Sequence, residues 1–291
     1  MSERATCISV KGSFPKSPEY EFLNRLRESV IDGIHESFPG STLLSLGSLR
    51  ISAPPTGPIC SWPYYEDGLW WVQDTAASIP ALALAQEMSK LGHYESKSVA
   101  DLCAAPGGKT AQLSNLGFQK IVAVELSSKR MQRLKENMSR LSYEWDMVNT
   151  DASNWFPSEQ FNGILVDVPC SATGTACKNP DVLQTTGTDL AGLIEIQHRL
   201  ACHASSLLTH NGVMVYSTCS VLRQESEDQV QRLLESSSGA TLELIPFQEG
   251  ELPSLETAID KAGCIRTLPG TSYGELGTCD GFFLAKLRRV K

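Results

Sequence analysis

From residue 71 onward, short apolar runs alternate with stretches in which apolar residues recur every three or four positions. Continuous apolar runs are typical of strands buried on both faces, and the spaced pattern is typical of amphipathic helices. This alternation predicts an α/β fold with a doubly wound, mostly parallel sheet, whose last two strands form an antiparallel pair at its edge. The predicted strands are Val99 to Leu102, Ile121 to Val124, Met147 to Asn149, Ile164 to Val166, Val213 to Tyr216, Leu242 to Ile245 and Phe282 to Leu287. The predicted helices are Ile79 to Leu91, Lys109 to Leu116, Lys129 to Leu141, Asp189 to Leu208 and Glu225 to Leu234.

The first 70 residues follow a different pattern. Glu19 to Phe38 is predicted to be a helix, because apolar residues recur every four positions from Phe22 to Ile34. The stretch TLLSLGSLRIS predicts strands, and the following SAPPTGPICSWPYYEDG is rich in the proline and glycine typical of linkers. We therefore expect a small N-terminal α+β domain over residues 1–70 and a larger domain over 71–291.

Composition narrows the class of protein. The 291 residues include 25 Lys and Arg against 33 Asp and Glu, a net charge of −8 that argues against binding nucleic acid through the whole surface. This net charge does not exclude a local basic groove that binds nucleic acid. The nine cysteines form no C-x-x-C pair, so we expect free thiols, a cytoplasmic protein and no metal site. No apolar stretch approaches the ~20 residues of a membrane span, and MSERATCISV lacks a signal-peptide pattern, so we expect no membrane partner.

The stretch DLCAAPGGKT, residues 101–110, connects the first strand of the larger domain to a helix. It differs from a phosphate-binding P-loop because Cys103 occupies the position of the first glycine and Pro106 has no N–H to offer. The dinucleotide fingerprint G-x-G-x-x-G is absent as well. The small residues from Ala104 to Gly108 predict a turn at which a ligand comes close to the backbone and to a helix N-terminus.

Each of the first four predicted strands is followed by or ends in an acid, namely Asp101, Glu125, Asp151 and Asp167. Ligands of open α/β sheets lie beyond the carboxyl ends of the strands. Glu125 lies 18 residues after Gly107, close to the spacing at which an acid binds ribose hydroxyls, and Asp151 is expected to accept from an adenine amino group. Without a phosphate cradle, an adenosine with a charged sulfonium group fits best. We therefore expect S-adenosyl-L-methionine, with Asp101 near its cationic end.

Two cysteines lie just after strands at the same edge, Cys170 in VDVPCSATGT and Cys219 in VYSTCS. Elsewhere cysteines act as small apolar residues of the core, but these two lie among Ser, Thr, Pro and Gly in turns. Methylation of cytosine at C5 needs a thiolate that adds to C6, and the product must then be released. Asp167, three residues before Cys170, is a candidate donor to N3 of the ring if it carries a proton.

DLCAAPGGKT, DVPCSATGT, YSTCS and the closing DGFFLAKL, together with VQDTAAS, resemble the Sun/Fmu (RsmB-type) RNA cytosine-C5 methyltransferases over roughly residues 70–291. The resemblance implies a Rossmann-like class I methyltransferase domain with a seven-stranded sheet and S-adenosyl-L-methionine as cofactor. It implies Cys219 as nucleophile, Cys170 as the residue that assists release, and one cytosine of 16S ribosomal RNA as substrate. The implied cofactor contacts are Cys103, Ala104, Ala105, Pro106, Gly107, Gly108, Lys109, Glu125, Asp151 and Asp167.

The sequence departs from the family pattern in three places. Glu125 stands where the family usually has Asp, and residues 176–181, ACKNPD, stand where it usually has two arginines followed by His-Pro-Asp. A helical RNA-binding domain usually precedes the small domain. Candidate phosphate contacts are Lys178, Arg223, Arg266 and the tail KLRRVK, while Trp70 and Trp71 either stack on RNA bases or, as we favour, pack under the linker.

Three alternatives stay open. A DNA cytosine methyltransferase would use Cys170, in the Pro-Cys motif, as nucleophile and would not need Cys219. A ribosome assembly factor that binds S-adenosyl-L-methionine without catalysis would show RNA binding but no methyl transfer. The substrate could also be another RNA. We expect a monomer.

Overall fold

The computed structural model describes residues 6–10, 33–34, 36–92, 96–184, 189–236 and 240–291. The helix predicted over 19–38 therefore lies mostly outside the described residues. Within the described part of the chain, every helix is too short or too polar to cross a bilayer.

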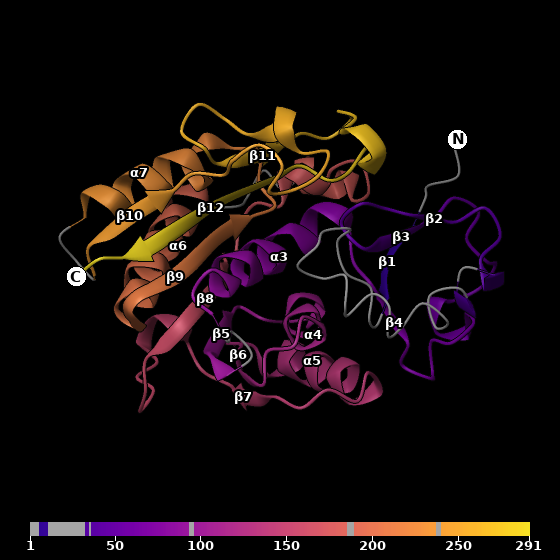
Figure 1. Cartoon of the computed structure of the whole chain (residues 1–291), viewed down its shortest axis with the longest axis horizontal. Coiled ribbons are helices and arrows are strands. Elements are labelled where there is room, and N and C mark those ends of the chain that lie inside the picture. Colours follow the sequence, from indigo (N-terminus) through magenta and orange to yellow (C-terminus); the bar gives the residue numbers. More distant parts are fainter. Residues whose placement is uncertain (1–5, 11–32, 35, 93–95, 185–188, 237–239) are drawn as a thin grey trace.

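The larger sheet has eight strands, seven of which follow the order β10-β12-β9-β8-β5-β6-β7, with β11 paired to β12 beside this path (Figure 1). Strands β5 to β9 are mutually parallel, and β12 runs antiparallel to β9, β10 and β11. This confirms the predicted mostly parallel sheet with an antiparallel edge. The strands are β5 (Ser98–Leu102), β6 (Lys120–Val124), β7 (Asp146–Val148), β8 (Phe161–Asp167), β9 (Leu208–Thr218), β10 (Leu242–Ile245), β11 (Ile265–Thr267) and β12 (Phe282–Arg289).

Helices cover both faces of this sheet, as a doubly wound fold requires. On one face, α3 and α4 form a buried apolar core with the strands, and α6 and α7 form a second core on the other face (Figure 1). The amphipathic α5 packs its buried Met131, Leu134 and Met138 against α4 and Trp71. The helices are α3 (Thr75–Ser89), α4 (Gly108–Asn115), α5 (Ser128–Arg140), α6 (Leu190–Ser206) and α7 (Glu227–Glu235).

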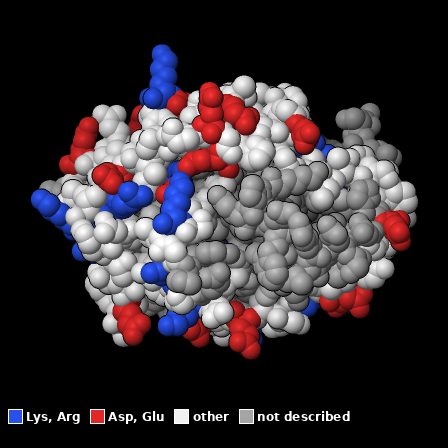
Figure 2. Space-filling view, viewed as in Figure 1, with Lys and Arg blue, Asp and Glu red and all other residues white. Residues whose placement is uncertain are grey.

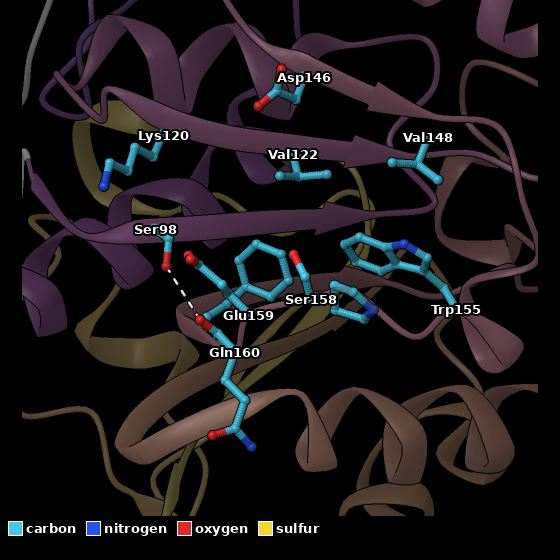
Figure 3. Close-up of a pocket in the computed structure, with 11 residues that line it drawn as sticks. Ser98, Lys120, Val122, Asp146, Val148, Trp155, Ser158, Glu159 and Gln160 are labelled. Atoms are coloured by element: carbon cyan, nitrogen blue, oxygen red, sulfur yellow. Dashed lines mark hydrogen bonds between the residues drawn. The ribbon is translucent and has the colours of Figure 1, made fainter.

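The connection between β7 and β8 contains only a single 3-10 turn, Ala152–Asn154, where the other parallel strands are joined through α-helices. A groove of about 560 Å³ lies beside this connection, with Val122, Val148 and Trp155 on its wall (Figure 3). Ser98 and Lys120, at the amino ends of β5 and β6, also line it. The groove therefore lies toward the edge of the sheet opposite the predicted ligand edge, and we do not assign the chemistry to it.

A second, four-stranded antiparallel sheet has the order β2-β3-β1-β4. Its core joins Ile8, Phe38, Trp62 and Trp70. Trp70 is fully buried and Trp71 is 5% exposed, which confirms that this pair packs inside the protein. The strands are β1 (Thr6–Val10), β2 (Thr42–Leu43), β3 (Ser48–Ile51) and β4 (Trp70–Val72).

The last strand of the small sheet, β4, crosses the predicted domain boundary at residues 70/71, and that boundary stays a prediction. The guanidinium of Arg140, at the end of α5, links the two parts. It donates to the carbonyl oxygens of Tyr65 at 2.6 Å and Trp70 at 3.1 Å, and its central carbon lies 3.9 Å from the centroid of the Tyr65 ring. The two sheets are therefore joined by specific contacts to backbone groups.

A charged cluster lies inside the larger part of the molecule, beneath α3 and β12. Lys286 is fully buried, and its Nζ lies 2.8 Å from Glu87 and 2.7 Å from Glu251. Although burial raises the pKa of Glu87, hydrogen bonds and charges from Lys286 and Lys90 bring that pKa below its usual value of 4.5. The ionised carboxylates are therefore stabilised by the folded structure above that pH and lose this stabilisation as the pH falls.

We expect Lys286→Met to lower the free energy of unfolding by about 3 kcal/mol at neutral pH, because the buried Glu87 and the partly buried Glu251 lose their buried cation and keep only more exposed ones such as Lys90. The difference from wild type should shrink as the pH falls through 4.5, since protonated carboxyls cost less to bury. Urea unfolding at both pH values measures this. The matched control is Lys90→Gln, which removes a lysine that binds the same two acids but is 52% exposed, and it should cost less than about 1 kcal/mol. Equal losses from the two variants would contradict the assignment.

Candidate active site

The predicted glycine turn forms one wall of a cavity at the carboxyl edge of the parallel strands. Gly107 precedes the first residue of α4 with φ of 102°, a backbone conformation that residues with a Cβ rarely adopt. The Ala104 N–H donates to the carbonyl oxygen of Val124 at 3.0 Å, which fixes the turn against the end of β6. The cavity has a volume of about 220 Å³ and is lined by Val72, Gln73, Asp74, Ala77, Asp101, Cys103, Ala104, Ala105, Pro106, Gly108, Lys109 and Asp167.

The structure thus brings seven of the ten predicted cofactor contacts to one cavity. Gly107, Glu125 and Asp151 do not line it. Gly107 lies within the same turn, and Glu125 reaches that turn through a hydrogen bond from Ala105. Among the ten predicted contacts, Asp151 has no hydrogen bond to the glycine turn in the described part of the structure.

Asp101 is a fully buried carboxyl group on the cavity wall. Its Oδ2 accepts a hydrogen bond from Thr110 Oγ1 at 2.6 Å, while Oδ1 is buried and has no hydrogen-bond partner among the described residues. Burial raises the pKa of Asp101 to about 7, although the bond from Thr110 opposes this rise. A buried acceptor without a partner is costly, so the site is suited to a ligand that donates to Asp101.

Cys103 lies in the turn with a left-handed φ of 64°. Burial and the nearby carboxylates, Asp167 first among them, raise the pKa of its thiol to about 12. Cys103 therefore stays protonated and unreactive near neutral pH, and it contributes to the cavity by packing.

Glu125 follows β6 and is held in place from three sides. Its Oε1 accepts from the Ser127 N–H at 2.9 Å, its Oε2 accepts from the Ala105 N–H at 3.3 Å, and Arg130 lies 3.6 Å away. The same Arg130 donates to the Ala105 carbonyl oxygen at 2.6 Å, so one residue of α5 connects the acid and the turn. Leu126, next to this acid, is 68% exposed and offers an apolar surface beside it. The sequence interpretation missed Arg130 and Leu126.

Asp151 follows β7 and caps the 3-10 turn after it. It accepts from the Ser153 N–H at 2.9 Å, from Ser153 Oγ at 2.6 Å and from Asn154 Nδ2 at 2.9 Å. The hydrogen bond from the Ser153 hydroxyl is the main reason that the pKa of Asp151 lies below its usual value. Its carboxylate therefore remains ionised and has a structural role whether or not it also binds a ligand.

Asp167, the last residue of β8, forms an ion pair with Lys109 at the first turn of α4, with 2.7 Å between Oδ2 and Nζ. Its Oδ1 accepts from Ser217 Oγ at 2.9 Å. Burial alone lowers the pKa of Lys109, but the charge of Asp167 and the hydrogen bond to it raise that pKa above its ordinary value. Lys109 is thus a fixed cation in the cavity lining, and its charge also acts on Cys219.

Cys170 and Cys219 come together, as the sequence predicted that they would. They follow the carboxyl ends of the neighbouring strands β8 and β9, and their sulfur atoms lie 3.4 Å apart. Their hydrogen bond lowers the pKa of Cys170 and raises the pKa of Cys219, because one proton lies between the two sulfurs. The shift belongs to the pair: the first proton leaves more easily than from an unpaired thiol, and the second is held more tightly. Once the first proton has left, the pair consists of one thiolate beside one thiol.

Backbone contacts at Gly174 hold the two cysteine segments in register. The Gly174 N–H donates to the Cys219 carbonyl oxygen at 2.8 Å, and the Gly281 N–H donates to the Gly174 carbonyl oxygen at 2.9 Å. A Cβ at position 174 would lie 2.0 Å from the Gly281 oxygen, so only glycine allows this approach. The motifs DVPCSATGT, YSTCS and DGFFLAKL thus contact one another through backbone hydrogen bonds, although they lie far apart in the sequence.

Three of the predicted phosphate contacts already have acidic partners. Lys178 pairs with Asp74 and Asp280, Arg223 with Asp228 and Arg266 with Glu227. Basic and acidic side chains also lie interspersed over the face seen in Figure 2. Binding RNA through these residues would require an exchange of ion-pair partners, and their role stays a prediction. In the described ranges, no group of three His, Cys, Asp or Glu residues could hold a metal ion.

Comparison with known proteins connects this geometry to a family. A family profile described as 16S rRNA methyltransferase RsmB/F matches residues 88–288. Ribosomal RNA small subunit methyltransferase B of Shewanella oneidensis is 35% identical over 70% of this chain and 47% of its own length. The protein of the same name from Cronobacter sakazakii is 32% identical over 92% of this chain and 56% of its own length. The chain thus spans about half the length of these relatives.

Solved structures agree with the fold. The crystal structure titled NSun6 from Pyrococcus horikoshii with SFG superposes with a TM-score of 0.65 and 25% identity, covering 85% of this chain and 61% of the other. The profile match extends over most of the chain and includes the glycine turn, both cysteine segments and the closing motif. The chain therefore belongs to the 16S rRNA methyltransferase RsmB/F family.

Proposed function

We propose that this protein is an S-adenosyl-L-methionine-dependent RNA cytosine-C5 methyltransferase that acts on 16S ribosomal RNA in the cytoplasm. The observation that carries the proposal is the distance of 3.4 Å between the sulfurs of Cys170 and Cys219 at the carboxyl edge of the sheet. Methylation at nitrogen or oxygen has no need of a thiol nucleophile, whereas methylation at C5 of cytosine needs one. Membership of the RsmB/F family supports the choice of RNA, and the names of the relatives support 16S ribosomal RNA.

The cavity at the glycine turn fits the proposed cofactor. Asp101 Oδ1 is a buried acceptor without a partner, which suits the ammonium group of a methionine. Glu125 is fixed beside the turn where ribose hydroxyls would donate, and the exposed Leu126 next to it suits the face of an adenine ring. When bound, S-adenosyl-L-methionine supplies an electrophilic methyl group held on a sulfonium sulfur.

In the proposed reaction, the pair of cysteines carries one proton throughout. The shared proton first moves from Cys219 to Cys170 across the hydrogen bond between the two sulfurs. Cys219 then attacks C6 of the cytosine as the thiolate, and this addition makes C5 nucleophilic toward the methyl group. After transfer, the C5 proton leaves to water and its electron pair re-forms the C5–C6 double bond. The C6–S bond breaks with its electrons on the sulfur of Cys219, and Cys170, 3.4 Å away, protonates that sulfur as it departs.

The proposed role of Asp167 at N3 of the ring needs a change in its contacts. Its two carboxylate oxygens have partners, Lys109 and Ser217. Asp167 can donate to N3 only as a protonated carboxyl, so we propose that the approach of the ring separates it from Lys109, that water supplies the proton, and that the proton returns to water after the reaction. The hydrogen bond with Cys170 and burial raise the pKa of Cys219, and the charge of Lys109 opposes this rise.

Two measurements test the proposed function. Bisulfite sequencing of 16S ribosomal RNA after incubation with the protein and cofactor should reveal one protected cytosine. RNA that contains 5-fluorocytosine should be trapped as a covalent adduct, because fluorine cannot leave as a cation in place of the proton. RNA binding without either signal would favour the non-catalytic assembly factor, and protection of a cytosine in another RNA alone would overturn the choice of 16S.

Cofactor affinity should depend on the ionisation of Asp101. Its pKa of about 7 in the free protein should fall when a cation binds beside it, so the affinity for S-adenosyl-L-homocysteine, which keeps the ammonium group, should weaken as the pH falls below 7. The limiting slope is about tenfold per pH unit. Titration calorimetry at several pH values measures this, and Asp101→Asn should bind weakly with no such slope. A flat wild-type profile would contradict the contact.

A further inference from the structure

Glu225 is a buried carboxylate that the proposed reaction does not use. It ends a short 3-10 turn, Arg223–Glu225, after the Thr-Cys-Ser motif, and its side chain is fully buried. Within the described part of the chain, no Lys, Arg or His forms an ion pair with it. A buried carboxylate is tolerated only where hydrogen bonds replace its hydration, so the donors that surround Glu225 show what it holds.

All three of those donors belong to the surroundings of Cys170. The backbone N–H of Ser171 donates to Glu225 Oε1 at 2.9 Å, and the Ser171 hydroxyl donates to Oε2 at 2.5 Å. Gln197 Nε2, from α6, donates to Oε1 at 2.8 Å. The same Nε2 donates to the carbonyl oxygen of Pro169 at 2.8 Å. Glu225 and Gln197 thus hold the residues on both sides of Cys170.

The segment that ends at Glu225 begins just after Cys219 in the sequence. Ser220 follows Cys219, and its hydroxyl oxygen lies 3.2 Å from Ser171 Oγ and 3.1 Å from Thr173 Oγ1. The Tyr216 hydroxyl, from β9, donates to the Glu225 carbonyl oxygen at 2.8 Å. The carboxylate is therefore attached through its backbone to the strand that carries Cys219 and through its side chain to the loop that carries Cys170.

We propose that Glu225 is a positioning residue that fixes the Cys170 loop against Cys219 and thereby sets the distance between the two sulfurs. This inference rests on the proposed function, since it gives Glu225 a purpose only if Cys170 protonates the departing sulfur. It assigns to Glu225 the release of the methylated base and leaves the attack by Cys219 unaffected. Displacement of a reacting group by about 1 Å commonly costs about 10²-fold in rate, so a small movement of the loop is enough.

The test separates release from attack. Glu225→Ala removes all three acceptor contacts, and Ser171→Ala removes only the hydroxyl contact and leaves the fold with a smaller change. In single-turnover reactions with unmodified RNA, we expect the covalent adduct to form at the wild-type rate in both variants. Its decay should slow about 10²-fold in Glu225→Ala and about tenfold in Ser171→Ala. Glu225→Gln, which can still accept from the Ser171 N–H, should restore most of the release rate.

Glu227→Gln is the matched control. It removes a carboxylate two residues away that pairs with Arg266, and it should leave the ratio of decay to formation unchanged. A purely structural role for Glu225 predicts equal loss of both rates, or none in a folded Ser171→Ala variant, and either result would overturn the proposal. A wild-type protein that forms no adduct would instead contradict the proposed function, so the two failures are distinguishable.

Discussion

Replacing Cys219 with alanine should abolish both methyl transfer and the covalent adduct. The thiolate that adds to C6 is then missing, and C5 of cytosine is too weak a nucleophile to attack a methyl group unaided. Loss of a catalytic nucleophile commonly costs on the order of 10⁶-fold in turnover, so we expect no product above background. Tritium transfer from labelled S-adenosyl-L-methionine to RNA measures turnover, and denaturing gels of 5-fluorocytosine RNA measure the adduct.

Cofactor affinity provides the control for this variant. Cys219 does not line the cavity at the glycine turn, so Cys219→Ala should bind S-adenosyl-L-homocysteine as wild type does. A folded Cys219→Ala protein that still forms the adduct would assign the attack to another residue. If Cys170→Ala abolished the adduct in the same experiment, the protein would follow the arrangement expected of DNA cytosine methyltransferases.

Replacing Cys170 with alanine should have the opposite effect on the adduct. Cys219 keeps its sulfur and can attack, while the thiol that protonates the departing sulfur is gone. General acid catalysis contributes about 10² to 10⁴-fold, so turnover should fall by that factor while adduct accumulates on unmodified RNA, with no need of fluorine to trap it. The amount of protein that migrates with RNA on a denaturing gel measures the accumulation.

The pH dependence of this variant gives an independent readout. In wild type, the reactive state is the singly ionised pair, in which one thiol donates a hydrogen bond to the thiolate beside it. Without Cys170 this stabilisation of the Cys219 thiolate is lost while its burial remains, so the rate of adduct formation should reach its plateau at a higher pH than in wild type. Equal pH profiles, or adduct that decays at the wild-type rate, would show that the two sulfurs do not share a proton during the reaction.

Much of this arrangement could be predicted from local sequence. Buried parallel strands read as continuous apolar runs, and the predicted run Val99 to Leu102 lies within β5 in the structure. Turns that need positive φ select glycine, which made Gly107 recognisable. Cys170 and Cys219 stood out because each followed a strand in a polar context, and adjacent parallel strands bring such residues to the same edge.

The remainder depends on contacts between distant segments, which spacing does not encode. Glu225 bonds Ser171 across 54 positions, and the sequence predicted only that Glu225 begins a helix. Arg130 lies within the predicted helix Lys129 to Leu141, and its position in the sequence does not indicate the contact with Glu125 that the structure shows. The strand β11 was missed because three residues carry no periodicity. Lys286 belongs to the basic tail KLRRVK in the sequence, yet in the structure it is buried and forms an ion pair with Glu87.

The position of β4 has a practical consequence for dividing the protein in the laboratory. Its last residue, Val72, and the next two, Gln73 and Asp74, form part of the cavity wall, while Trp70 belongs to the core of the small sheet. A fragment that starts after this strand would lose Val72 from that wall and leave Arg140 without its two carbonyl acceptors. We therefore expect that removing the small sheet would disturb the cavity at the glycine turn. Experiments that aim to isolate RNA binding should replace side chains instead of cutting the polypeptide there.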